Sequence, residues 1–231
     1  MTRTLQEVHL SHRSNWLRAA VLGANDGILS TSSLVLGVAG SGASGGAIVT
    51  AGVAGAVAGA LSMAAGEYVS VSSQSDTEKA DLSLERRELA ADPEGELLEL
   101  AAVYRERGLP EELAEQVARA LSTRDAFAAH VRDELGLEEG RRARPLQAAW
   151  SSAAAFSAGA ALPLVAAVAA PGSIRTLAIV VVTLLALALL GTTGARLGGA
   201  PRLAATARVL LWGIAAMAIT YVIGAAVGTV T

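Results

Sequence analysis

The chain has 231 residues, of which 52% are hydrophobic and only 3% aromatic, and its formal net charge is −3. It lacks cysteine, which excludes disulfides, thiolate metal sites and iron–sulfur clusters. Its single lysine, Lys79, does not belong to a Walker-type phosphate-binding loop, which argues against an ATP-driven pump of the P-loop class. The long runs of Ala, Gly, Val and Leu are typical of membrane helices that pack through small residues.

Five apolar segments are long enough to cross a hydrocarbon layer of roughly 30 Å as helices of about 20 residues. They lie near residues 16–40, 47–72, 146–170, 174–195 and 205–229. We therefore predict an all-α membrane protein with five transmembrane helices and a helical domain inserted between the second and the third. The expected divisions are residues 1–72, 73–144 and 145–231.

The arginines predict the orientation of these spans. They precede the first span, follow the second, and lie between the fourth and the fifth, whereas the remaining loops carry only Arg175. The positive-inside rule then places the N-terminus and the inserted domain in the cytosol and the C-terminus outside. The use of Arg in place of Lys and the abundance of Ala suggest a bacterial chain in the plasma membrane.

The inserted stretch predicts a small helical domain. No Gly or Pro interrupts the residues after the second span until Asp92-Pro93, so this span is expected to continue as a helix to that point. Asp is a favourable N-cap and Pro suits the first helical position, so a new helix should begin there. Gly108 and Pro110 predict the next boundary, and a last helix is expected over residues 123–135.

Eighteen of the 21 acidic residues lie between Asp76 and Glu139. They include two E-x-x-E pairs at equal distances on either side of Asp92. The four carboxylates are Glu85, Glu88, Glu96 and Glu99. If the chain folds back at Asp92, they can converge and bind hard or borderline divalent cations. A solvated helix face balanced by arginines is the alternative, and the residues alone leave both open.

The last helix of the insert brings His130, Asp133 and Glu134 to one face. A role as metal ligands and a role as an ordinary helix end, with the acids paired to Arg132, are both open from the sequence.

Two acids lie inside apolar segments. Asp26 is about ten residues into the first span, where a charge costs ~2.5–3.5 kcal/mol and therefore indicates function. In the second span Gly55, Gly59, Met63 and Glu67 follow one another at intervals of four, on one stripe of the helix. Met63 offers either a thioether ligand or simple packing. Glu67, near the cytosolic end, is either a ligand or faces water.

A membrane acid beside an acidic domain also suggests a coupling mechanism. Burial raises the pKa of a carboxyl group and a bound cation lowers it, so a metal ion that arrives at such a group displaces protons. This predicts exchange of metal for protons.

Two long motifs carry a resemblance. The segment GANDGILSTSSLVLG in the first span and the segment GALSMAAGEYVSVSSQSDTEKADL at the end of the second resemble the vacuolar iron transporter family. The similarity continues through ERRELAADPEGELLEL and covers nearly the whole chain.

The resemblance implies a homodimer that exchanges Fe²⁺ or related divalent metals for protons along a path at the two-fold interface. It assigns Asp26 and Met63 to the membrane metal site, with Glu67 in the same motif. It assigns the four paired glutamates to a cytosolic metal-binding domain that gathers metal, with Glu134 as a further acid. Members often add a methionine in the last cytosolic helix. This chain has methionine only at positions 1, 63 and 217, so the preference for Fe²⁺ over Mn²⁺ is left open.

The expected function is therefore a secondary transporter, not an enzyme, that moves Fe²⁺ out of the cytosol, with Mn²⁺ as a second candidate cargo. Its expected partners are divalent metal ions, protons, the lipid bilayer and a second copy of the chain. No prosthetic group and no nucleic acid are expected, because the arginines are dispersed and the insert is acidic. The alternative is a membrane-anchored ferroxidase or a metal-storage or sensing protein without flux. Ferritin-like di-iron sites use E-x-x-H pairs, and the two E-x-x-E pairs here lack that histidine.

Overall fold

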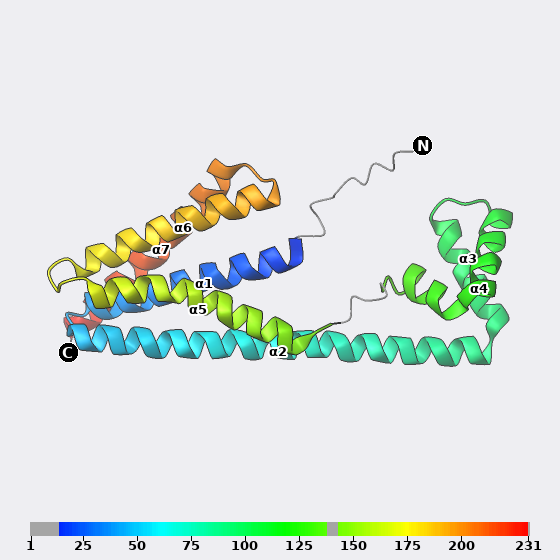
Figure 1. Ribbon diagram of the computed structural model, residues 1–231, viewed down its shortest axis with the longest axis horizontal. Coiled ribbons are helices and arrows are strands. Elements are labelled where there is room, and N and C mark those ends of the chain that lie inside the picture. Colours follow the sequence, from blue (N-terminus) through cyan, green and yellow to red (C-terminus); the bar gives the residue numbers. More distant parts are fainter. Residues whose placement is uncertain (1–13, 138–142, 231) are drawn as a thin grey trace, which may run out of the picture. The chain divides into compact units, whose positions relative to one another are not determined.

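The computed structural model describes residues 14–137 and 143–230 and contains only helices in these ranges. The seven helices are α1 (Ser14–Gly40), α2 (Gly45–Ala91), α3 (Pro93–Glu106), α4 (Glu111–Asp133), α5 (Pro145–Ala169), α6 (Arg175–Gly198) and α7 (Arg202–Gly228). Figure 1 shows their order along the chain. The all-α prediction is confirmed.

The chain forms two compact units, which we describe separately. The membrane unit comprises Met1–Tyr68 and Leu146–Thr231, and the polar unit comprises Val69–Pro145. Helix α2 runs without interruption from one unit into the other, as expected from the absence of Gly and Pro after the second span.

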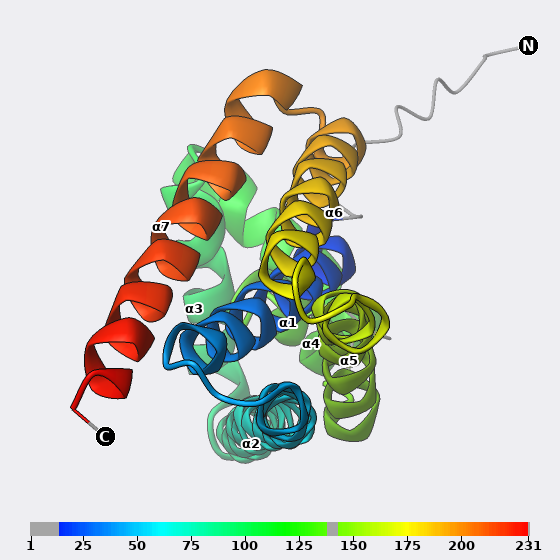
Figure 2. The ribbon, with the colours of Figure 1, turned by 90° about the vertical axis from the view of Figure 1, so that its left-hand side faces the viewer.

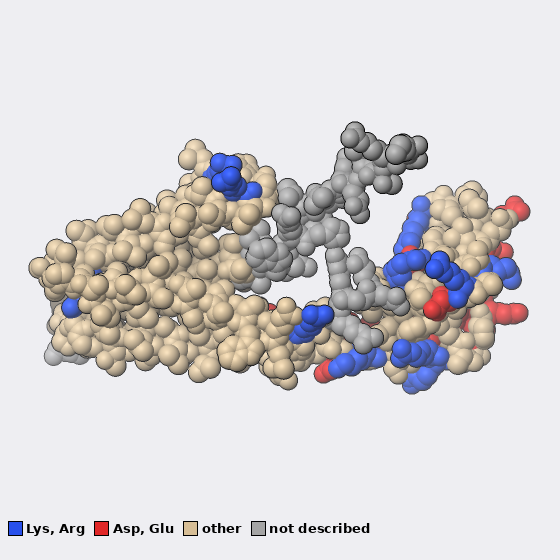
Figure 3. Space-filling model, viewed as in Figure 1, with Lys and Arg blue, Asp and Glu red and all other residues tan. Residues whose placement is uncertain are grey.

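Five helices, α1, α2, α5, α6 and α7, are long and apolar enough to cross a membrane, which confirms five spans. Their outward faces carry large apolar side chains such as Leu185, Leu211 and Trp212, which are 66%, 67% and 70% exposed. A water-soluble unit would bury such groups, whereas lipid solvates them. Figure 3 shows that the visible face of the membrane unit carries few charged side chains, while the polar unit carries many. The chain is a multi-pass membrane protein.

Close helix contacts in the membrane unit depend on glycine. A Cβ atom at Gly27 of α1 or at Gly159 of α5 would collide with backbone atoms of the opposite helix. The same holds for Gly224 of α7 against Gly37 of α1. Small residues let membrane helices approach until their backbones touch, which raises their dispersion attraction. Figure 2 shows α1 between its neighbours, and its buried face includes Val35 and Leu36.

In the polar unit, α3 packs against α4 around a small apolar core. This core contains Leu100, Ala101, Ala118 and Ala129. Helix α3 begins as predicted, because the Asp92 side chain accepts a 2.9 Å hydrogen bond from the Gly95 N–H and Pro93 is the first helical residue. Helix α4 bends at Asp125, whose backbone is extended and whose side chain caps the next turn. The last helix predicted from residue 123 is therefore the second part of α4.

Candidate functional site

Three helices of the polar unit bring their polar side chains to one ring nitrogen. His130 Nδ1, on α4, lies 3.0 Å from Glu85 Oε1 on α2 and 3.7 Å from Glu96 Oε2 on α3. It lies 2.7 Å from Glu134 Oε2, one turn further along the chain. We call these four residues the Glu/His cluster. The ligand atoms of Glu85, Glu96 and His130 all lie within 4.8 Å of one another, which is the spacing needed to hold one metal ion.

The Glu/His cluster is enclosed by the polar unit. The side chain of His130 is 0% exposed and Glu85 is 3% exposed as a residue. Glu85 Oε1 and His130 Nε2 are both buried and have no hydrogen-bond partner among the described residues. Buried polar atoms are normally paired, because an unpaired one loses its hydration without compensation. The cluster therefore has the spacing of a cation site and, in Glu85 Oε1, a buried acceptor atom that a cation would satisfy.

Burial raises the pKa of the Glu85 carboxyl, and the negative charge of Glu134 raises it further, while His130 acts in the opposite direction. Burial is also the main reason why the pKa of Glu96 is raised, followed by repulsion from Glu99. Both shifts mean that the charged form of each carboxylate is less favourable in free energy inside the polar unit than in water. A divalent cation between them would offset that difference.

The other two paired glutamates lie differently. Glu88 and Glu99 are exposed, although their charges still act on Glu85 and Glu96. The structure thus brings one member of each E-x-x-E pair into the buried cluster and leaves the other at its edge in water.

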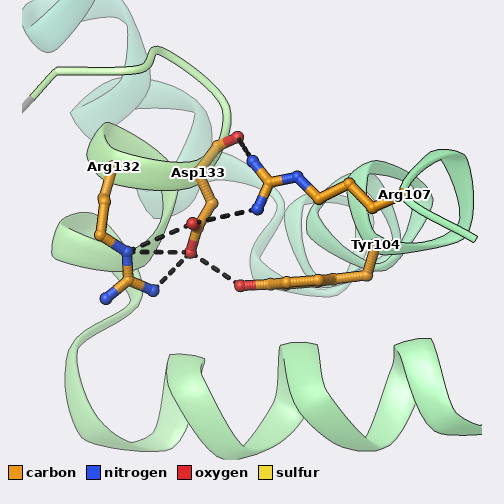
Figure 4. A network of polar contacts seen from close by, with 4 residues as sticks. All are labelled: Tyr104, Arg107, Arg132 and Asp133. Carbon is orange, nitrogen blue, oxygen red and sulfur yellow. Dashed lines mark hydrogen bonds and ion pairs between the residues drawn. The ribbon is translucent and has the colours of Figure 1, made fainter. Parts of the chain in front are cut away.

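Asp133 belongs to a separate network, shown in Figure 4. Its carboxylate accepts hydrogen bonds from Tyr104 Oη at 2.7 Å and from Arg107 Nη1 at 3.3 Å. Its immediate neighbour, Arg132, contacts the same carboxylate. The hydrogen bond from Arg132 is the largest cause of the fall in the pKa of Asp133 to about 2. Asp133 therefore ties α4 to α3 and does not face the Glu/His cluster.

The membrane unit contains a second candidate site. A pocket of about 180 Å³ between α1 and α2 is lined by Asp26, Ser30, Thr31, Leu34, Gly55, Gly59, Ser62, Met63 and Phe156. It unites a carboxylate, a thioether and three hydroxyl groups. Thr31 is 1% exposed and its Oγ1 has no hydrogen-bond partner among the described residues.

The stripe predicted on α2 lies along this pocket in part. Gly55, Gly59 and Met63 line the pocket, and Glu67, one turn further, does not. Asp26 is exposed in the single chain, and no basic side chain of the described ranges pairs with it.

Known proteins resemble this chain over most of its length. The sequence profile of the VIT family matches residues 17–225, which is most of the chain. The chain belongs to the VIT family.

Several relatives of this VIT-family chain have been named. A protein of Acanthamoeba castellanii named vacuolar iron transporter is 46% identical over 212 residues, which cover 91% of this chain and 78% of the relative. Vacuolar iron transporter homolog 2 of Arabidopsis thaliana is 39% identical, covering 91% and 84%. Vacuolar iron transporter homolog 5 of Oryza sativa subsp. japonica is 41% identical, covering 93% and 82%. The family predicted from the two motifs is confirmed.

Two residues at these candidate sites are not assigned to them by the sequence alone. For His130 the sequence signal is its spacing of four residues from Glu134, which puts both on one helix face. For Thr31 the signal is the run of hydroxyl residues that begins one turn after Asp26.

Proposed function

We propose that this chain is a secondary transporter that moves divalent transition-metal ions out of the cytosol in exchange for protons, with Fe²⁺ as the main cargo and Mn²⁺ as a second candidate. The relatives named as iron transporters support the cargo. The observation that carries the proposal is the pocket of the membrane unit, where Asp26 of one span and Met63 of another line the same space.

The ligand set of this pocket suits the proposed cargo. Carboxylate and hydroxyl oxygens bind hard cations, while a thioether favours softer ones. A site that combines Asp26 with Met63 therefore favours a borderline ion such as Fe²⁺ over Mg²⁺ and Ca²⁺. Thr31 Oγ1, buried at the same pocket and unpaired among the described residues, is available as a further oxygen ligand.

The exposure of Asp26 supports a homodimer. A carboxylate that faces lipid near the middle of a span costs ~2.5–3.5 kcal/mol, and a water-filled path or a neighbouring helix removes this cost. A second copy of the chain that covers α1 would enclose Asp26 in such a path between the two protomers.

The Glu/His cluster would gather cargo before transfer. We place the polar unit in the cytosol, following the distribution of arginines. Glu85, Glu96 and Glu134 would hold the ion, and the exposed Glu88 and Glu99 would attract it from solution. Glu67, on α2 beyond Met63, would lie on the route toward the membrane pocket.

Exchange for protons follows from ligand chemistry. A carboxylate must be ionised to bind a metal ion, so binding releases protons and release of the ion allows protons to return. A pH gradient would then drive the metal against its own gradient.

Flux into sealed liposomes tests the proposal. The full chain is reconstituted, Fe²⁺ or Mn²⁺ is supplied outside, and its entry is followed with an internal metal-sensitive dye, with and without a pH gradient. We expect flux that depends on the gradient and is lost in Asp26→Asn. Asp81→Asn is the control. It removes an exposed acid of α2 that lines neither candidate site, and this variant should transport normally.

Undiminished flux in Asp26→Asn would contradict the role of the membrane pocket, and flux that ignores the pH gradient would contradict proton exchange. Metal binding without any flux would instead indicate a store or sensor. Oxygen consumption on addition of Fe²⁺ would indicate a ferroxidase.

A further inference from the structure

The Glu/His cluster contains one nitrogen donor among carboxylate oxygens. His130 comes from α4 and its Nδ1 faces Glu85 at 3.0 Å, Glu96 at 3.7 Å and Glu134 at 2.7 Å. Its side chain is 0% exposed, so the ring has no access to bulk water. Three helices, α2, α3 and α4, are needed to assemble this arrangement, and the residues that form it all belong to the polar unit.

Acceptor atoms outnumber donors in this enclosure. A single N–H at Nδ1 makes one good hydrogen bond, and the shortest contact is to Glu134. Glu85 Oε1 remains buried without a hydrogen bond. An enclosure with surplus buried acceptors has the composition of a cation site, and it places the imidazole nitrogen at the point where the acids converge.

The end of α4 holds the backbone of His130. The carbonyl of His130 accepts hydrogen bonds from the N–H groups of Glu134 and Leu135, at 2.9 and 3.1 Å. Gly136 then adopts φ +65°, a left-handed conformation that glycine adopts without strain, and the chain leaves the helix. Because Asp133 is held by Tyr104 and Arg107, Glu134 is the acid of this helix end that contacts the imidazole.

We infer that His130 is the specificity-determining ligand of the Glu/His cluster, and that it makes the cluster prefer Co²⁺, Ni²⁺ and Zn²⁺ over Mn²⁺ and Mg²⁺. This rests on the proposed function only in taking the cluster as a metal-binding site. Imidazole suits the later transition metals, while purely carboxylate sites suit Mg²⁺, Ca²⁺ and Mn²⁺. One nitrogen among three carboxylates therefore changes the order of affinities, with Fe²⁺ between the two groups.

The replacement His130→Asn isolates this effect. The Asn side chain branches where the imidazole does, so its amide oxygen can occupy the place of Nδ1. The variant keeps a ligand of similar reach but replaces nitrogen by oxygen. It is best made in the full chain carrying Asp26→Asn. This second substitution weakens metal binding at the membrane pocket, so that the measured binding reports on the Glu/His cluster.

Competitive binding of Co²⁺ and Mn²⁺ to this protein in detergent gives the readout. With His130 present we expect Co²⁺ to bind more tightly than Mn²⁺. In His130→Asn this preference should fall by at least about tenfold. Loss of a residue that only supports a metal ligand already lowers metal affinity by about 10–100-fold, and His130 is proposed as a ligand itself. Mn²⁺ binding should be retained, and the visible absorption bands of bound Co²⁺ should shift.

Two outcomes would overturn the inference. One is equal loss of Co²⁺ and Mn²⁺ binding in a folded variant, which would mean a packing role for His130. The other is the absence of any preference in the protein that retains His130. If His130→Asn does not fold, X-ray absorption of bound Co²⁺ in a chain with His9 and His12 replaced by Asn settles the point. His130 is then the only histidine, and a spectrum without imidazole scattering would reject it as a ligand.

Parallel flux measurements separate this inference from the proposed function. Liposomes are prepared with the chain whose Asp26 is intact. A cobalt preference that depends on His130, together with no flux into liposomes, would reject transport and leave the inference standing. Metal flux into liposomes without a preference of the Glu/His cluster for Co²⁺ over Mn²⁺ would reject the inference and leave transport standing.

Discussion

Asp133 and Glu134 are adjacent in the sequence, but they face different partners. Glu134 contacts the buried imidazole of His130 at 2.7 Å, whereas Asp133 accepts a hydrogen bond of 2.7 Å from Tyr104 of α3. Consecutive side chains on a helix point about 100° apart, so two neighbouring acids serve separate environments. One belongs to the Glu/His cluster and the other holds two helices together.

The first prediction concerns pH and the stability of the polar unit. The pKa of Asp133 is lowered to about 2, first by the hydrogen bond from Arg132. A carboxyl whose pKa is lower in the folded state stabilises the fold above its unfolded pKa of about 4. This contribution is lost as the pH falls from about 4 through about 2. Thermal unfolding of the full chain in detergent, followed by circular dichroism across this range, measures it.

Asp133→Asn should remove this pH dependence and lower the free energy of unfolding by about 1–3 kcal/mol, the usual loss for a hydrogen-bonded charged group. Glu134→Gln is the matched control, since it alters the next residue and should affect metal affinity more than stability. Equal stability of Asp133→Asn and the unmodified chain would contradict the structural role of the network.

The second prediction is that metal stabilises the chain through Glu85. A ligand that binds only the folded state at a hundredfold excess over its Kd adds about 2.7 kcal/mol. Glu85→Gln should be at least as stable as the unmodified chain without metal, because it removes a buried charge that faces Glu134. It should gain little stability on addition of Mn²⁺ or Co²⁺, as measured by the unfolding temperature.

Glu115→Gln serves as the control here, because Glu115 is an exposed acid of α4 outside the Glu/His cluster. It should retain the full metal-dependent rise. If Glu85→Gln shows the same rise, the cluster is not the site where metal stabilises the protein.

The third prediction separates two methionines. Met63 lines the membrane pocket, whereas Met217 is buried in the apolar core of the membrane unit. Leu replaces Met at similar volume, and such exchanges usually cost less than about 1.5 kcal/mol in stability. Met63→Leu should therefore fold but transport Fe²⁺ more slowly, by about tenfold, since a metal contact is lost.

Met217→Leu should transport at the normal rate in the same liposome assay. Equal effects of the two substitutions would indicate that Met63, too, only packs.

The fourth prediction tests the close approach of α1 and α5. A Cβ atom at Gly159 would collide with the backbone of Ala24, so Gly159→Ala should lower the resistance of the chain to thermal unfolding in detergent. The expected loss is about 1–3 kcal/mol, typical of overpacking. A Cβ atom at Gly66 of α2 would meet open space. Gly66→Ala should therefore be neutral or stabilising by up to about 1 kcal/mol, because Ala favours the helix.

An unchanged unfolding temperature in Gly159→Ala would mean that α1 and α5 can separate at no cost, and that their glycines do not set the spacing. An equal fall in both variants would point to a general effect of the substitution.

The features that the sequence predicted well are local ones. Span lengths follow from runs of apolar residues, and the start of α3 follows from Asp92 and Pro93, whose own chemistry caps and begins a helix. The family follows from motifs that are contiguous in the chain. An acid within an apolar run, as at Asp26, is also visible without any knowledge of packing.

The tertiary structure alone decided which acids meet. Glu85 and Glu88 share a helix face, as do Glu96 and Glu99, so periodicity treats the members of each pair alike. Burial distinguishes them, because the angle and level at which α2, α3 and α4 cross admit only one carboxylate from each pair to His130. That crossing is set by contacts between residues far apart in the sequence, and no local pattern encodes it.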